Sequence, residues 1–240
     1  MIAQKESGEV EDSRTEVSEP LGKRRPGRPR QAEPSAAYLE RQAEIVDTAT
    51  RVFGDRGYEI ATLEDVAGRL DLRKASLYHY IKSKSHLLYL IFDRAIGSAL
   101  AELRTLDDTE DPEFRLAAAV AQQALRVGQD LALFNVFFDA RPHLDDHHAT
   151  SIRELERDYL QVFVEACQAA MDAGVLPAAT EPRYAAQAFL GMTSWVYKWF
   201  SPERDDVVLF ASTCVELVIG RPHPAAVEHA RAVVAGSSTP

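Results

Sequence analysis

Hydrophobic positions repeat at helical spacing along most of the chain beyond residue 38, and no stretch alternates as a β-strand would. This pattern predicts an all-α protein. The helix starts are marked by residues that suit an N-cap, such as Ser83 and Asp111, and several helix ends are marked by glycine. The predicted helices cover residues 38–53, 63–70, 74–80, 84–100, 112–128, 131–140, 146–174, 182–200 and 205–219.

The second and third predicted helices are short and are joined by a tight turn. Thr62 suits the N-cap of the second helix, and Asp65 follows three residues later as a weak capping box. Asp71 tolerates the left-handed backbone that a turn requires, and Leu72 is expected to return to the core. Two short helices packed on a longer one form a helix-turn-helix, in which the last helix enters the major groove of DNA.

The stretches "ATLEDVAGRL" and "RKASLYHYIKSK" resemble the DNA-binding domain of the TetR family of repressors, and the resemblance covers residues 38–92. Three positions depart from the family pattern. Asp71 stands where glycine is usual, Arg73 where a capping serine is usual, and Ile81 where phenylalanine is usual. The resemblance implies an all-α fold with a three-helix DNA-binding head on a helical body for ligand binding and dimerisation.

Two kinds of DNA contact are expected from this head. Lys74 and Ser76 are the candidates for base edges, whereas Tyr78 and Lys84 are expected to hydrogen-bond phosphates. Arg73 is expected to reach a phosphate or a guanine once DNA is bound. Ordinary packing is the alternative interpretation for the aromatic side chains. The full set of candidates is Thr62, Arg73, Lys74, Ala75, Ser76, Tyr78, His79, Tyr80 and Lys84.

The charge distribution adds an N-terminal arm to this picture. The chain carries a net charge of -10, yet residues 21–94 are net basic, which places the attraction to anions near the N-terminus, although a solvated face is the alternative. Residues 1–35 are polar and without periodicity, so a disordered arm is expected. Its Pro-Gly-Arg-Pro sequence resembles an AT-hook, with Arg28 in an A·T minor groove and Arg25 and Arg30 beside it. General attraction to phosphates is the alternative.

Large apolar side chains gather on two predicted helices of the body. They exceed what a minimal bundle needs and could line a ligand cavity, although core packing is the default interpretation. These residues are Phe134, Phe137 and Phe138 on one helix and Met192, Trp195 and Trp199 on another.

The stretch "GMTSWVYKWFSP", residues 191–202, resembles that of TetR members that respond to acyl-CoA thioesters. The resemblance implies that Lys198 neutralises a CoA phosphate, with Arg141 as a second candidate, although Lys198 is equally well explained as a snorkelling surface cation. It also implies that the last two predicted helices pair with those of a second subunit, as a two-half-site operator demands.

Other functional classes find little support in the sequence. The segment "HLDDHH", residues 143–148, offers metal ligands, but its acidic residues also suit a helix N-terminus, so no metal or cofactor is expected. Neither a Ser-His-Asp order nor a phosphate loop points to an enzyme. Cys167 and Cys214 resemble core residues of a reducing cytoplasm, and no run is long enough to cross a membrane.

These observations predict a cytoplasmic, dimeric repressor that leaves a palindromic operator when a hydrophobic acid, or its CoA thioester, fills the body. The alternatives are an architectural protein for A·T-rich DNA and, less favoured, a helical acyl-CoA enzyme. The expected organisation is an arm over residues 1–35, a DNA-binding domain over 36–83, a ligand-binding and dimerisation domain over 84–222 and a tail over 223–240.

Overall fold

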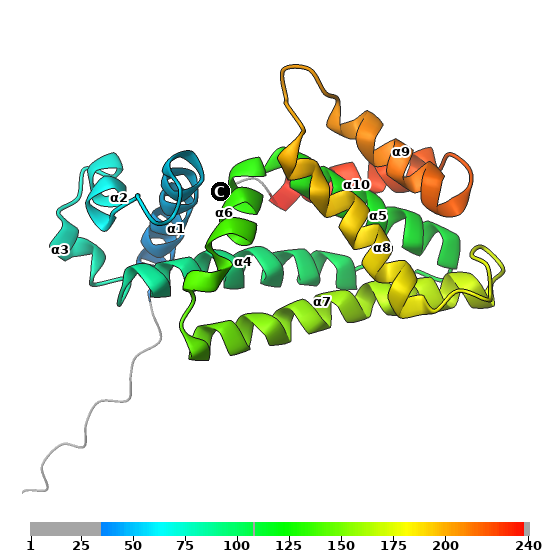
Figure 1. Cartoon of the computed structure of the whole chain (residues 1–240), viewed down its shortest axis with the longest axis horizontal. Coiled ribbons are helices and arrows are strands. Elements are labelled where there is room, and N and C mark those ends of the chain that lie inside the picture. Colours follow the sequence, from blue (N-terminus) through cyan, green and yellow to red (C-terminus); the bar gives the residue numbers. More distant parts are fainter. Residues whose placement is uncertain (1–34, 108, 238–240) are drawn as a thin grey trace, which may run out of the picture. The chain divides into compact units, whose positions relative to one another are not determined.

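The computed structural model describes residues 35–107 and 109–237, and its described residues beyond Ser35 belong to one compact unit. All regular elements in this part of the chain are helices, which confirms the predicted all-α fold (Figure 1). The AT-hook-like sequence, with Arg25, Arg28 and Arg30, lies outside the described residues.

The head consists of α1 (Ala36–Arg56), α2 (Leu63–Arg69) and α3 (Lys74–Leu77), and α4 (Lys84–Arg104) leads away from it into the body (Figure 1). The helix starts follow the predicted capping. Thr62 forms a complete capping box with its partner three residues later, and the Ser83 hydroxyl accepts a hydrogen bond from the first turn of α4.

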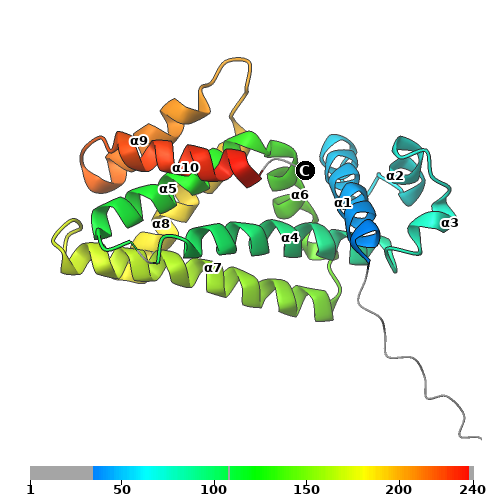
Figure 2. The ribbon, with the colours of Figure 1, turned by 180° about the vertical axis from the view of Figure 1, so that it is seen from behind.

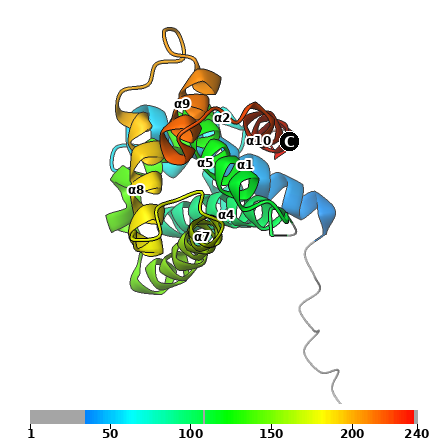
Figure 3. The ribbon, with the colours of Figure 1, turned by 90° about the vertical axis from the view of Figure 1, so that its right-hand side faces the viewer.

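The body packs α7 along α4 and places α5 against both α9 and α10 (Figures 2 and 3). Apolar side chains on one face of each helix drive this packing because burial removes them from water. The body elements are α5 (Pro112–Gln129), α6 (Leu131–Ala140), the 3₁₀ turn η1 (Arg141–His143), α7 (Asp146–Asp172), α8 (Pro182–Ser194), the 3₁₀ turn η2 (Trp195–Lys198), α9 (Val207–Ile219) and α10 (Pro224–Ser237).

The structure corrects three expected boundaries. Helix α3 ends at Leu77 rather than Tyr80, and α8 gives way to a 3₁₀ turn after Ser194. The segment expected as a tail contains α10, which packs on α5. A helical stripe in the sequence carries this packing, and its buried members are Ala226, Val227, Ala230 and Val234.

The head and the body share one hydrophobic core. The cluster that contains the buried residues of α1, α2, α3 and the start of α4 also contains Val136 and Ala140 of α6 and Ile152 of α7. A second cluster fills the body between α5, α7, α9 and α10. The expected domain boundary near residue 83 therefore crosses continuous packing, so a displacement of α6 or α7 acts directly on the head.

Both cysteines are buried free thiols, and burial raises the pKa of Cys167 to about 12 and that of Cys214 to about 11. Such thiols are unreactive at neutral pH, because the thiolate is the reactive form. None of the helices in the described ranges combines the length and the apolar character needed to cross a bilayer.

Candidate nucleic-acid interface and ligand cavity

Helix α3 is held on the head by the apolar side chain at its last position and by another in the turn that follows it. These residues, Leu77 and Ile81, are 0% and 2% exposed. The turn before α3 is also as predicted, because Asp71 has a φ of 52° and the Leu72 amide donates to the carbonyl of Ala67. A four-residue helix has little stability of its own, so these contacts determine which of its side chains face outward.

The outward face of α2 and α3 carries most of the predicted DNA contacts. Six of them are exposed and Ser76 is partly exposed, which leaves them accessible to a bound duplex. The Arg73 side chain makes no capping hydrogen bond to α3, in keeping with the missing serine. The DNA role of each residue stays a prediction. The exposed six are Thr62, Arg73, Lys74, Ala75, Tyr78 and His79.

Tyr80 lies against α1 rather than on this face. Its ring is 4.9 Å from that of Tyr38, and its carbonyl accepts a hydrogen bond from the side chain of Gln42 at 3.0 Å. The Tyr38 hydroxyl donates to the carbonyl of His79 at 3.3 Å. These contacts attach the turn after α3 to α1, so the geometry favours a packing role for Tyr80 over a DNA contact.

Lys84 is engaged inside the protein. Its ammonium group donates to the carbonyls of Tyr58 and Glu59 and lies 4.3 Å from the centre of the Tyr58 ring. Partial burial lowers the pKa of Lys84. The side chain thus ties the loop between α1 and α2 to the start of α4, which competes with the predicted phosphate contact.

Replacing Lys84 by methionine is expected to lower the free energy of unfolding by about 1–3 kcal/mol, because hydrogen bonds to a charged donor are lost while the aliphatic stem remains. Thermal or urea unfolding measures the change, with the exposed neighbour Lys82→Met as the control. If Lys84 serves phosphates instead, stability will be unchanged and the slope of log affinity against log salt will fall by about 1.

Lys74 is restrained by an acidic residue of the other short helix. Its ammonium group lies 2.6 Å from a carboxylate oxygen of Glu64, and both side chains are exposed. This hydrogen bond lowers the pKa of Glu64 and raises that of Lys74. An exposed pair of this kind contributes little to stability, so its main effect is on which partner Lys74 can contact.

Replacing Glu64 by glutamine is therefore expected to tighten binding to all duplexes by about two- to fivefold, because Lys74 is released and a charge that repels phosphates is removed. Fluorescence anisotropy on several duplexes measures the change. Glu228→Gln breaks a comparable exposed pair with Arg231 on α10 and provides the control. A gain for one sequence only would assign Glu64 a base contact instead.

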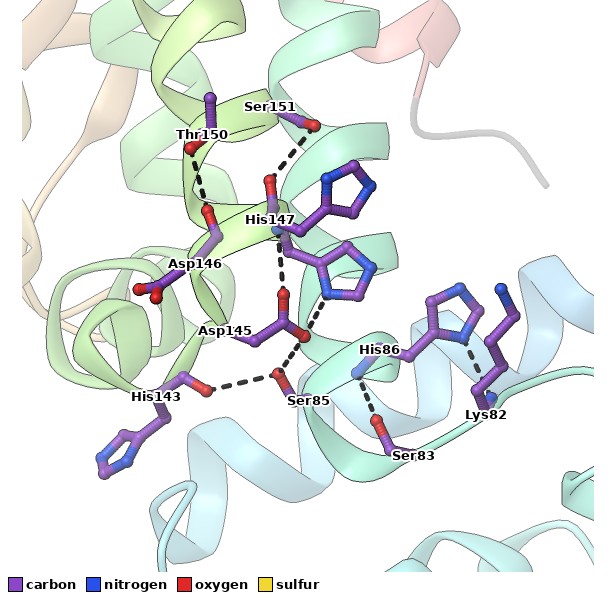
Figure 4. A network of polar contacts seen from close by, with 11 residues as sticks. Lys82, Ser83, Ser85, His86, His143, Asp145, Asp146, His147, Thr150 and Ser151 are labelled. Carbon is purple, nitrogen blue, oxygen red and sulfur yellow. Dashed lines mark hydrogen bonds and ion pairs between the residues drawn. The ribbon is translucent and has the colours of Figure 1, made fainter.

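A histidine junction, defined by His86, Tyr89, Asp145 and His148, connects the start of α4 to the start of α7. Figure 4 draws the polar contacts of His86 and Asp145. Asp145 caps α7 by accepting a hydrogen bond from the His148 amide at 3.0 Å. The same carboxylate lies 2.7 Å from the ring of His148, and Ser85 of α4 donates to it at 3.5 Å.

Ring contacts complete the histidine junction. The rings of Tyr89 and His148 stack at 4.4 Å, and those of His86 and His148 are 5.6 Å apart. The segment considered as a metal site thus forms a helix cap, and no metal-holding group of three His, Cys, Asp or Glu side chains occurs in the described ranges. Burial lowers the pKa of His86, with smaller contributions in the same direction from His148 and Lys82 and an opposing one from Asp145.

The lowered pKa of His86 predicts a loss of stability in mild acid. Above the ordinary value of 6.5 the residue is neutral in both states, so no penalty arises. As the pH falls below 6.5 the unfolded chain takes up a proton that the folded protein resists, so stability decreases until the folded-state pKa is passed. Unfolding temperatures at pH 7.5 and 5.5 measure the effect. The decrease in unfolding temperature between pH 7.5 and pH 5.5 should become smaller in His86→Gln. It should remain in His79→Gln, which removes an exposed histidine and serves as the control.

A cavity of about 210 Å³ lies between helices α4 to α8 of the body. Its wall is mainly apolar, and the three phenylalanines predicted from α6 belong to it. Phe138 is also partly exposed, which locates the mouth of the cavity beside it. The lining residues are Ala95, Ile96, Ala99, Gln123, Arg126, Leu133, Phe134, Phe137, Phe138, Glu156, Tyr159, Leu190 and Ser194.

The remaining predicted ligand residues do not line this cavity, and their roles toward a ligand stay predictions. Trp195 and Trp199 are 62% and 49% exposed, because the 3₁₀ turn after α8 changes the direction of the following side chains. Met192 packs against the core of the body. Lys198 lies outside, 3.6 Å from Asp139 and 4.6 Å from the centre of the Tyr197 ring.

Arg141 is also separated from the cavity. Its guanidinium group makes a two-pronged ion pair with Glu156 and lines a different hollow, between η1 and α7. Burial raises the pKa of Glu156, while the charge of Arg141 opposes the shift. The guanidinium group is therefore neutralised before any ligand arrives.

The polar residues of the cavity were not predicted. Arg126 forms an ion pair with Glu102 of α4, and both side chains are largely buried. The Tyr159 hydroxyl donates to the side-chain oxygen of Gln123 at 2.6 Å, and the amide of Gln123 donates to the hydroxyl of Ser194 at 3.2 Å. The available signal was a glutamine and an arginine three residues apart among the apolar residues of the second half of α5, a spacing that puts both on one helix face.

Comparisons with known proteins agree with this division into head and body. Residues 45–89 match the family described as "Bacterial regulatory proteins, tetR family", and residues 109–204 match the family described as "Tetracyclin repressor-like, C-terminal domain". The two matches cover the helix-turn-helix and most of the helices around the cavity.

Three known proteins indicate the range of similar regulators. The transcriptional activator FasR of Mycolicibacterium smegmatis is 34% identical over 82 residues, which cover 34% of this chain and 37% of that protein. The transcriptional repressor KstR2 of Rhodococcus jostii is 23% identical over 177 residues, covering 72% of this chain and 86% of that protein. The crystal structure of AibR with isovaleryl coenzyme A and operator DNA is 28% identical, with a TM-score of 0.69, and covers 76% of this chain and 100% of that chain.

Proposed function

Since the chain belongs to the TetR family of transcriptional regulators, we propose that it is a repressor that releases its operator when a hydrophobic acid, carried as its CoA thioester, occupies the cavity. It is a ligand-responsive regulator rather than an enzyme, and the similar proteins with known roles are transcriptional regulators. The observation that carries the proposal is the course of α4. Its first turns belong to the core of the head, and its middle turns line the cavity.

This course of α4 gives the ligand a direct effect on the head. A ligand that fits a displaced arrangement of α4 and α7 better than the resting one shifts the population toward heads that no longer match the operator. A hundredfold preference for that arrangement corresponds to about 2.7 kcal/mol. Two recognition helices must lie one turn of DNA apart on a palindromic site, so a small change in their separation is enough for release.

A dimer is part of the proposal, because a palindromic operator has two half-sites. The surfaces of α8 and α9 support this arrangement through large apolar side chains that are well exposed in the single chain. Exposed apolar side chains of this size on adjoining helices are typical of protein interfaces. They are Tyr184 on α8 and Leu209 and Leu217 on α9.

The cavity supports an acyl group as the buried part of the effector. Its wall is mainly apolar, and its volume of about 210 Å³ is below the roughly 300–1,000 Å³ of sites that enclose a whole drug-sized ligand. A CoA nucleotide must therefore remain outside. At the mouth, Phe138 stacks on Tyr197 at 4.6 Å, and Lys198 lies over the Tyr197 ring. This position supports a contact between the Lys198 cation and the phosphates of an emerging CoA chain. The complex of AibR with isovaleryl coenzyme A is a similar structure with such a ligand.

Fluorescence anisotropy with an operator selected from random duplexes tests the proposal. We expect tight binding to the selected duplex, weaker binding to an unrelated one, and release by isovaleryl-CoA but not by CoA alone. Measurement at two salt concentrations separates base recognition from general attraction to phosphates. Equal binding to all duplexes would favour an architectural protein. Tighter operator binding with the thioester would contradict release and favour the opposite sign of control.

A further inference from the structure

The polar side of the cavity carries hydrogen-bond donors that its own contacts use only in part. Arg126 uses one nitrogen for Glu102, and Gln123 uses one amide hydrogen for Ser194. Arg126, Gln123 and Ser194 keep further hydrogen-bond donors that these contacts do not use, and one carboxylate oxygen of Glu102 is buried without a hydrogen-bond partner among the described residues. The side-chain oxygen of Gln123 already accepts from Tyr159. A ligand group that accepts hydrogen bonds therefore suits the donors of this wall, whereas a second carboxylate would face the buried oxygen of Glu102.

The charges around the cavity are already balanced. Glu102, near the C-terminal end of α4, neutralises Arg126 near the C-terminal end of α5. Arg141, which lies outside the cavity, neutralises Glu156. The Arg126 and Glu102 side chains are 17% and 13% exposed, so water screens them only weakly. A carboxylate entering the cavity would add an unpaired negative charge near two glutamates, and burial of such a charge is costly.

From these two observations we infer that Glu102 makes the cavity selective for a neutral carbonyl group, such as that of a thioester, over the free carboxylate of the same acid. Glu102 acts as a positioning residue. It holds Arg126 in place as a hydrogen-bond donor for the carbonyl oxygen, and it cancels the positive charge that would otherwise attract a carboxylate. This inference rests on the proposed function, because it specifies the chemical form of the ligand for the same cavity.

Selectivity for the thioester over the free acid determines which metabolic form of the acid the regulator detects. Free acid is the product of thioester hydrolysis, and a cavity with an uncompensated arginine would respond to both species. With Glu102 present, the protein responds to the activated acid only. The expected preference for a neutral thioester over the matching acid is at least about 100-fold, because the buried unpaired charge costs several kcal/mol.

Calorimetric titration of the full-length protein without DNA tests the inference. The probes are the isovaleryl thioester of N-acetylcysteamine and isovalerate, which share the acyl group and both lack the nucleotide. In the unmodified protein the thioester should bind at least about 100-fold more tightly than the acid. In Glu102→Gln, isovalerate should gain at least about tenfold in affinity, because Arg126 keeps a hydrogen-bond partner but loses its counter-charge. The thioester affinity should change less than about threefold.

Two further variants distinguish a specific effect of Glu102 from a general loss of folding. Glu154→Gln removes a charge from an exposed position of α7 and should leave both affinities unchanged. The double variant Glu102→Gln/Arg126→Gln restores the charge balance, so the acid should bind as weakly as in the unmodified protein. Its thioester affinity should fall about threefold to tenfold because a charged donor is replaced by an amide. Unfolding temperatures and operator affinity without ligand confirm that each variant is folded.

The outcomes separate this inference from the proposed function. Equal or tighter binding of isovalerate by the unmodified protein would overturn the selectivity, while release of the operator by isovaleryl-CoA would still stand as evidence for the effector. An unchanged acid affinity in folded Glu102→Gln would overturn the role of Glu102. If Glu102→Gln does not fold, the double variant Glu102→Gln/Arg126→Gln still tests the inference. Thioester binding as tight as in the unmodified protein would show that Arg126 is not the hydrogen-bond donor for the carbonyl oxygen. Binding of neither probe would overturn both proposals.

Discussion

Replacing Leu77 by alanine is expected to lower the free energy of unfolding by about 2–5 kcal/mol and to abolish binding to the operator. The side chain is fully buried and anchors a helix of only four residues, so the cavity left by the substitution lies directly under the recognition surface. Chemical unfolding measures the first effect, and anisotropy with the selected operator measures the second.

The neighbouring substitution Tyr78→Ala provides the matched control. Tyr78 is 50% exposed, so its loss should change stability by no more than about 0.5 kcal/mol. Binding should nevertheless weaken on all duplexes, because the predicted phosphate contact is lost. If Leu77→Ala retains operator affinity at a temperature where it is folded, α3 is not the recognition element. If Tyr78→Ala binds as the unmodified protein does, its phosphate role is wrong.

Replacing Gly54 by alanine is expected to destabilise the protein by about 1–3 kcal/mol and to weaken operator binding. A Cβ atom at this position of α1 would lie 2.8 Å from the Cβ atom and 3.1 Å from the carbonyl oxygen of Ala132 on α6. The second atom belongs to the backbone, so a rotamer change cannot relieve the contact. Helix α1 must move away from α6, and the head must move with it.

The same substitution at Gly97 should act in the opposite direction. This glycine lies within α4, and an added Cβ atom would meet nothing within 4 Å. Alanine there should stabilise the protein by about 0.5–1 kcal/mol, because it restricts the unfolded chain more than glycine does. Unfolding curves and operator titrations of both variants measure the effects. A neutral Gly54→Ala would show that the contact between α1 and α6 adapts and does not determine the position of the head.

Local patterns account for much of the fold. The capping box at Thr62 and the left-handed Asp71 were both predicted, because each depends on residues within one or two helical turns. The outward face of α3 follows from the same periodicity. The end of α3 was predicted less well, since packing of Tyr80 on α1 competes with continuation of the helix.

Tertiary contacts and a local change of helix type explain where the site differs from what the sequence indicates. Lys84 resembles a phosphate ligand in sequence, yet carbonyls 25 and 26 residues away occupy its ammonium group. Arg141 resembles a free cation, yet Glu156 neutralises it. Trp195 and Trp199 are exposed because a 3₁₀ turn interrupts the helix at Trp195, whereas Phe200 of the same stretch is buried. None of these partners is marked by spacing along the chain.

The amino-acid sequence by itself determined the all-α class, the helix-turn-helix and the surface of α3, because periodicity and capping act over a few residues and leave a direct pattern. Only the tertiary structure decided which polar residues line the cavity, how their charges are balanced, and how α4 joins the cavity to the head. Those properties depend on which helix faces come together, and the free energy of that packing is a sum over contacts between residues far apart in the chain.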